Sequence, residues 1–259
     1  MATLATRLGS CPLIATAIHD GHALREDLRD VIALSDAERR REEDPFTGRW
    51  ASICPTSIVV PSSRFQVDLN RPREASVYRT PQEAWGLAVW KRPLSDAQLF
   101  SAFAEHDAFY ALLARICDEK VEGCGGFVLF DLHSYNHRRQ GPEQPDPAWL
   151  CPDVNLGTGS VPPGRSREPI ERWLAVLREA RVGGRRLDVR ENAKFRGGYL
   201  SRWVHARYPE TGLALAIEVK KFFMDEWTGI ADEALLEEVK NALAAGVEAV
   251  AGAAPQRAS

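Results

Sequence analysis

The sequence has no long apolar segment, no paired cysteines and little excess charge, and each absence excludes a class of protein. No stretch reaches the roughly 18 apolar residues that a membrane helix requires, so we expect no membrane partner. The five cysteines are scattered and form no C-x-x-C pair, which indicates neither a zinc ribbon nor a disulfide framework. A net charge of −3 gives no general reason to expect nucleic-acid binding. We therefore expect a cytoplasmic protein that acts on a small molecule.

Four apolar runs predict the strands of a core. With 44% hydrophobic residues in a chain of 259, the protein can bury a sizeable core. The runs at 12–18, 126–132 and 213–219 are unbroken, which is typical of strands buried on both faces. A fourth run, at 56–70, breaks at Pro61 and resumes with the alternation of a strand.

Amphipathic segments between these runs predict helices. Apolar residues recur at helical spacing over 96–121, 165–182 and 232–252. Strands that alternate with helices favour an α/β fold with a largely parallel sheet, and we expect one domain over 1–259. The segment 136–153 is rich in proline and charge, and it predicts either an ordered loop near the site or a mobile lid.

Two histidines stand at the ends of predicted strands. His19 directly follows the first apolar run, and His133 directly follows the run at 126–132. Ligands collect beyond the carboxyl ends of the strands in open α/β sheets, so both imidazoles should face one crevice. Imidazole is a preferred ligand of Zn²⁺. The pair therefore predicts a zinc site, although either histidine alone would be read as an ordinary loop residue.

A catalytic zinc needs a third protein ligand, and the sequence offers two candidates. His22 stands at H-x-x-H spacing from His19. Glu43 belongs to the acidic cluster 42–44, which also resembles a solvated helix end. We favour Glu43 as the ligand and assign His22 to substrate binding, with the reverse assignment left open.

Glu218 is the one carboxylate inside an otherwise apolar strand pattern. A buried carboxylate is costly unless it is paired or used in chemistry. An ion pair with Lys220 or Lys221 is one interpretation. The other is a general base that takes a proton from water at the metal. Asp131, two residues before His133, is expected to orient a ligand rather than to bind metal.

Arginines follow the fourth apolar run. The segment 63–74 contains Arg64, Asn70 and Arg71, and a planar guanidinium can bind a carboxylate through two hydrogen bonds. Arg196 precedes two glycines, where backbone can approach a ligand closely. These residues predict an acidic substrate. The alternative, a basic surface patch, explains the segment less well, because acidic residues are interleaved among the arginines.

Together these motifs resemble the N-formylglutamate amidohydrolase family, which is similar to zinc carboxypeptidases and aspartoacylases. The matching phrases occur in the expected order over most of the chain. Two positions depart from the pattern: Ile18 stands where family members have proline, and His22 stands where carboxypeptidases have glutamate. Besides His19, the phrases are SRFQVDLNRPRE (63–74), FDLHSYN (130–136), DVNLGTG (153–159), FRGGY (195–199) and AIEVKKFFMDE (216–226).

The resemblance implies a three-layer α/β sandwich with a mostly parallel mixed sheet, of the carboxypeptidase and phosphorylase/hydrolase type. It implies a zinc-dependent amidohydrolase that removes a formyl or other acyl group from an acidic N-acyl amino acid. By it, His19 and His133 are metal ligands, Glu218 is the general base and Asn70-Arg71 bind the substrate carboxylate; Arg64 is expected to help stabilise the oxyanion. A carboxypeptidase-like peptidase and a non-catalytic binding protein of the same fold are the alternatives.

Overall fold

A seven-stranded mixed sheet forms the centre of the protein, seen in a computed structural model that describes residues 4–165 and 167–251. The strand order is β1-β3-β2-β4-β9-β5-β8. The four strands β3, β2, β4 and β9 are parallel to one another, whereas β1 and β5 run antiparallel to their neighbours β3 and β9. The strands are β1 (Ala5–Arg7), β2 (Leu13–Ala17), β3 (Thr56–Val59), β4 (Phe127–Tyr135), β5 (Val154–Gly157), β8 (Val189–Glu191) and β9 (Gly212–Lys220), with a separate hairpin of β6 (Arg181–Val182) and β7 (Arg185–Arg186).

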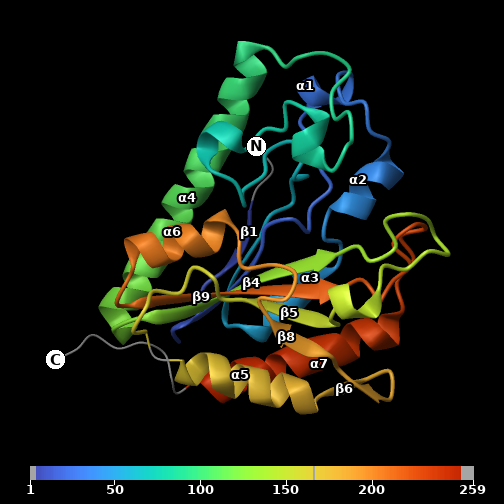
Figure 1. Ribbon diagram of the computed structural model, residues 1–259. Coiled ribbons are helices and arrows are strands. Elements are labelled where there is room, and N and C mark those ends of the chain that lie inside the picture. The colour runs from blue at the N-terminus through green and yellow to red at the C-terminus, as the bar shows by residue number, and fades with distance from the viewer. Residues whose placement is uncertain (1–3, 166, 252–259) are drawn as a thin grey trace.

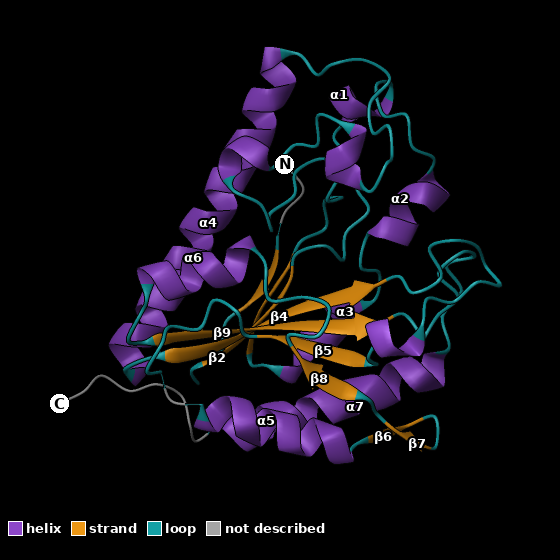
Figure 2. Cartoon of the chain, viewed as in Figure 1, coloured by secondary structure: helices purple, strands orange, loops and turns teal. Residues whose placement is uncertain are grey.

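Helices cover both faces of this sheet and make three layers. Figures 1 and 2 show α4 and α6 over one face and α5 and α7 over the other. Within the described residues, no helix is both long and apolar enough to cross a membrane. The α-helices are α1 (Glu26–Arg29), α2 (Asp36–Glu42), α3 (Thr47–Trp50), α4 (Asp96–Cys124), α5 (Glu168–Glu179), α6 (Tyr199–Arg207) and α7 (Glu233–Val250), and the 3₁₀ turns are η1 (Ala51–Ile53), η2 (Arg73–Ala75), η3 (Pro81–Ala84) and η4 (Ala148–Leu150).

The alternation of side chains along β4 divides the core in two. Phe130 packs with α5 and α7, whereas Leu129 packs with α4 and α6. Every residue of β4 is buried, which explains why the first half of the strand, 127–130, is an unbroken apolar run. Since side chains two residues apart share a face, His133 lies on the α4/α6 side of the sheet, as Leu129 does.

The predicted α/β fold with a largely parallel sheet is confirmed, and so are the three layers. Strands lie within or overlap the runs at 12–18, 126–132 and 213–219, and α4, α5 and α7 match the three predicted helices. Residues 166 and 252, at the edges of two predicted helices, lie outside the described residues. The short strands β5 and β8 and helix α6 had no clear sequence pattern.

The predicted continuation of the fourth strand beyond Pro61 is wrong. Within 56–70 only Thr56–Val59 is a strand, and the segment after Ser63 forms turns that are closed locally, as by the hydrogen bond of 2.9 Å from Gln66 N to Ser63 O. Phe65 and Val67 alternate because they are buried in two different clusters, not because they lie along a sheet. Burial on two sides of an irregular segment imitates the period of a strand.

We expect Trp173→Ala to destabilise the protein strongly. Trp173 lies on α5 with 0% exposure in the core shared with α7. Its removal should lower the free energy of unfolding by about 3–5 kcal/mol, as for other buried aromatic side chains. Trp149, which is 72% exposed, is the matched control, and its change to alanine should cost less than about 0.5 kcal/mol. Urea denaturation measures both, and similar losses for the two variants would contradict this layer assignment.

Candidate functional site

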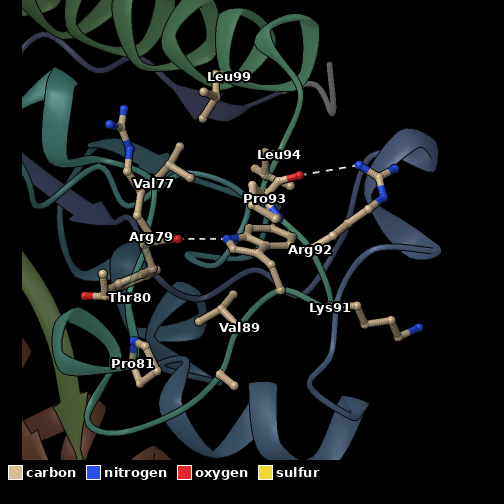
Figure 3. Close-up of a pocket in the computed structure, with 13 residues that line it drawn as sticks. Val77, Arg79, Thr80, Pro81, Val89, Lys91, Arg92, Pro93, Leu94 and Leu99 are labelled. Atoms are coloured by element: carbon tan, nitrogen blue, oxygen red, sulfur yellow. Dashed lines mark hydrogen bonds between the residues drawn. The ribbon is translucent and has the colours of Figure 1, made fainter.

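One cavity lies away from the carboxyl ends of the parallel strands. It has a volume of about 570 Å³ and is formed by residues 77–99, with Val77, Val89 and Trp90 among its walls (Figure 3). The indole N–H of Trp90 donates to the carbonyl of Tyr78. Among the described residues that line it there is no histidine, cysteine or carboxylate. This cavity therefore offers no group for acid–base or metal chemistry.

A second cavity, of about 370 Å³, lies where the parallel strands end. Its walls come from the segments after β2 and β3, from the ends of β4 and β9, and from the loop before α6. Six residues that were singled out in the sequence line it: His19, Arg64, Asn70, His133, Arg196 and Glu218. The fold thus gathers in one place groups that are up to two hundred positions apart in the chain.

Three buried side chains in this cavity form a group that could hold a metal ion: His19, Asp44 and His133. Their ligand atoms all lie within 4.8 Å of one another. Asp44 Oδ2 is 2.9 Å from Nδ1 of His133 and 3.4 Å from Nδ1 of His19. Nδ1 of His19 has no hydrogen-bond partner among the described residues. Both rings therefore turn the same nitrogen toward one carboxylate oxygen.

The other nitrogen of each ring faces a second carboxylate. Nε2 of His19 lies 2.8 Å from Asp68, and Nε2 of His133 lies 2.9 Å from Asp131. Thr16 Oγ1 in turn donates to Asp131 over 2.8 Å. A carboxylate at Nε2 holds the proton there and leaves Nδ1 free to bind, as is usual for metal-binding histidines. The donor set of two imidazoles and one carboxylate fits Zn²⁺.

The charges in the group also favour a bound cation. Burial opposes ionisation of Asp44, yet the hydrogen bond from His133 and the nearby imidazole of His19 outweigh it and lower the pKa of this carboxyl. Burial likewise opposes protonation of His133, but Asp131 and Asp44 raise the pKa of its imidazole. The carboxylates thus draw positive charge to this point, and a divalent ion would supply it.

Glu218 lies beside this group on the neighbouring strand. It pairs in register with His133 across β4 and β9, so the two side chains share a face of the sheet. Burial raises the pKa of Glu218 to about 8. The lysines that could have neutralised it are engaged elsewhere: Lys220 with Asp153 at 2.6 Å, and Lys221 with backbone carbonyls. The geometry favours the general-base interpretation over the structural ion pair.

The structure does not bring Glu43 or His22 to the metal-ligand group. Their side chains contact each other instead, with 2.5 Å between His22 Nδ1 and Glu43 Oε2, and Ser63 donates to the other carboxylate oxygen of Glu43. The backbone at Glu43 is extended, so consecutive side chains point in opposite directions. Asp44, the next residue of the same acidic cluster, is the one that reaches the histidines.

Arg64 and Arg71 have different surroundings. Arg64 lines the cavity, donates to Asp68 over 2.9 Å and lies over the ring of Trp85 at 4.8 Å. Arg71 is not among the residues that line the cavity; its guanidinium donates to the carbonyl of Glu83 over 2.6 Å. The predicted pair Asn70-Arg71 is therefore split, with only Asn70 at the cavity.

Asn70 connects His133 to the start of α6. Its Nδ2 lies 3.4 Å from Nε2 of His133, and its Oδ1 accepts the N–H of Leu200 over 3.1 Å. A Cβ on Gly198 would lie 2.0 Å from Oδ1 of Asn70, so only glycine allows this approach. Asn70 thus fixes the glycine segment that carries Arg196, whose exposed side chain lies at the cavity.

Several cavity residues gave no usable signal in the sequence. Asp44 was visible in the acidic cluster, but the choice within the cluster depended on backbone direction. Trp85 adopts a left-handed conformation (φ 53°) in a loop without any motif. The proline-rich segment 136–153 does begin at the site, where Asn136 and Arg139 line the cavity. Lys221 also lines it and is fully buried, which lowers its pKa to about 8.

Comparison with solved structures supports this fold. An N-formylglutamate amidohydrolase from Ralstonia eutropha JMP134 superposes with a TM-score of 0.76 at 18% identity, covering 97% of each chain. A gene product of Agrobacterium tumefaciens gives 0.63 at 15% identity, covering 95% of each.

Comparison of the sequence with known families gives the assignment. A search of curated proteins finds no match. The N-formylglutamate amidohydrolase family, in contrast, matches residues 11–224, which is most of the chain. The resemblance seen in the sequence motifs is thereby confirmed, together with the enzyme class, a hydrolase of a carbon–nitrogen bond other than a peptide bond. The chain belongs to the N-formylglutamate amidohydrolase family.

Proposed function

We propose that this protein is a zinc-dependent amidohydrolase that removes the acyl group from an acidic N-acyl amino acid such as N-formylglutamate. The observation that carries the proposal is the group of His19, Asp44 and His133 next to Glu218, a partly buried carboxylate for which no ion pair is found among the described residues. The Ralstonia eutropha protein of similar fold is named for the same reaction.

His19, Asp44 and His133 would hold the metal. Asp68 and Asp131 orient the two imidazoles from behind, so each ring presents Nδ1 to the cavity. Zinc in such sites polarises a substrate carbonyl and makes water more acidic. Three protein ligands leave a coordination position open, as catalytic rather than structural zinc sites require.

Glu218 would carry the proton during hydrolysis. As water attacks the amide carbonyl, the carboxylate accepts its proton, and it then delivers that proton to the leaving nitrogen. Burial raises the pKa of Glu218, which makes its carboxylate a stronger proton acceptor than that of an exposed glutamate. Arg64, which is held by Asp68 at the edge of the cavity, can donate a hydrogen bond to the oxyanion.

Arg196 would bind the carboxylate of the substrate. It lies at the cavity, and no ion pair involving its side chain is found among the described residues. Asn70 contributes indirectly, because it fixes the backbone that presents Arg196. Lys194, two residues before Arg196, adds a second positive charge to the same wall.

We expect Asp44→Asn to weaken zinc binding far more than Glu43→Gln. Asp44 faces both histidines, whereas Glu43 is paired with His22. The loss for Asp44→Asn should exceed the roughly 10–100-fold that removal of an outer-shell partner causes. A competition titration with a chromophoric chelator measures both affinities. A larger loss for Glu43→Gln would restore Glu43 as the third ligand.

We expect Glu218→Gln to lower kcat by about 10²- to 10⁴-fold while zinc remains bound. The amide has the shape of the carboxylate but cannot accept the proton. Turnover of N-formylglutamate, other N-acyl amino acids and small peptides should be measured beside the metal content. Near-normal turnover would exclude Glu218 as the base, and a preference for peptides would favour a peptidase over the proposed reaction.

We expect Arg196→Ala to raise KM for acidic substrates by about 10- to 100-fold, since a hydrogen bond to a charged group contributes about 1.5–3 kcal/mol. Arg71→Ala is the comparison, because Arg71 is bound to the carbonyl of Glu83 outside the cavity. Its KM should stay close to that of the wild type. The opposite ranking would show that Arg71 turns into the cavity when substrate binds.

A further inference from the structure

Lys221 carries a buried positive charge that the proposed chemistry does not use. It is 1% exposed and directly follows β9, where its backbone N–H donates to the carbonyl of Tyr135 over 3.0 Å. Removing an ammonium group from water costs several kcal/mol unless hydrogen bonds replace the lost water. The partners of Lys221 therefore indicate what this residue does.

The ammonium group binds two backbone carbonyls at the end of α2. Nζ donates to Arg41 O over 2.6 Å and to Glu43 O over 2.7 Å. Carbonyls in the last turn of a helix have no partner within the helix, and a lysine is well suited to bind them. The second of these carbonyls belongs to the peptide bond that joins Glu43 to Asp44.

The same peptide bond is also held from its other side. Asp44 N donates to His19 O over 2.9 Å, and the carbonyl of the next peptide bond, Asp44 O, accepts from Thr47 Oγ1 over 2.7 Å. Because both the C=O and the N–H of the Glu43–Asp44 peptide are hydrogen-bonded, the direction of the Asp44 side chain is fixed. That direction decides whether the carboxylate reaches Nδ1 of His133, 2.9 Å away.

We propose that Lys221 is a positioning residue, which holds the Glu43–Asp44 peptide so that Asp44 faces His19 and His133 and thereby sets the affinity of the metal site. The inference rests on the proposed metal function. The strand that carries Glu218 thus also fixes a metal ligand, through a contact at its exit three residues later.

Lys220 provides a matched control in the adjacent position. Its ammonium group lies 2.6 Å from Asp153 and 3.2 Å from the carbonyl of Cys151, on the far side from the Asp44 turn. Both lysines leave the same strand and both bind backbone oxygen, but only Lys221 contacts the segment that carries Asp44.

The test compares Lys221→Met with Lys220→Met in the full-length protein. After removal of metal, the zinc affinity is measured by competition with a chromophoric chelator, and the Tm of each metal-free protein is recorded. Both variants should lower Tm, because each leaves buried oxygen atoms without a donor. Only Lys221→Met should weaken zinc binding, by about 10- to 100-fold, as the loss of an outer-shell partner does.

Lys221→Arg and Lys221→Gln cover the case in which Lys221→Met does not fold. Arginine can donate to both carbonyls and should retain most of the zinc affinity, whereas glutamine is too short to span them and should lose it. Unchanged affinity in Lys221→Met or Lys221→Gln, or an equal loss in Lys220→Met, would overturn the positioning role. A wild-type protein that binds no zinc would overturn the proposed function together with this inference.

Discussion

The structure depends on the burial of several carboxylates around two imidazoles. Asp44, Asp68 and Asp131 are each at most 2% exposed, and each contacts His19 or His133. Such a concentration of negative charge inside a protein is stable only where cations and donors compensate it. Arg64 compensates part of it through Asp68, and the imidazoles compensate another part. The negative charge that stays uncompensated explains why this arrangement suits a divalent ion rather than a neutral ligand.

The position of this charge follows from the sheet. Parallel strands deliver the ends of β2, β4 and β9 to one edge, and each end carries a part of the site. Register fixes Glu218 opposite His133, because a shift by one residue would turn Leu213 and Leu215 from the α5/α7 core to the other face of the sheet, where the small side chain of Ala214 packs. The position of Glu218 relative to His133 is therefore a consequence of the packing of the core.

The residues of the site that lie in a strand or just after one could be predicted from the sequence, whereas the choice between neighbouring residues of a loop could not. His19, His133 and Glu218 each stand out against an apolar run, and the run itself reports the strand. Glu43 and Asp44 differ only in which way an extended backbone turns them, and no local pattern reports that direction. The strand predicted for 65–69 failed for a related reason, since burial from two sides in a loop has the same period as a strand.

The buried polar groups at the strand ends and the loop residues of the cavity depend on the fold to different degrees. The group of His19, Asp44 and His133 and the carboxylate of Glu218 are held by the ends of buried strands and by backbone contacts such as those of His19 with Asp44 and of Lys221 with Glu43. The opposite wall consists of irregular segments that carry Trp85, Arg139 and Arg196. Loop residues can be exchanged with little effect on a core, whereas strand residues cannot. The arrangement of the buried polar groups is therefore built into the fold, while the selectivity of the cavity depends on side chains that the fold constrains least.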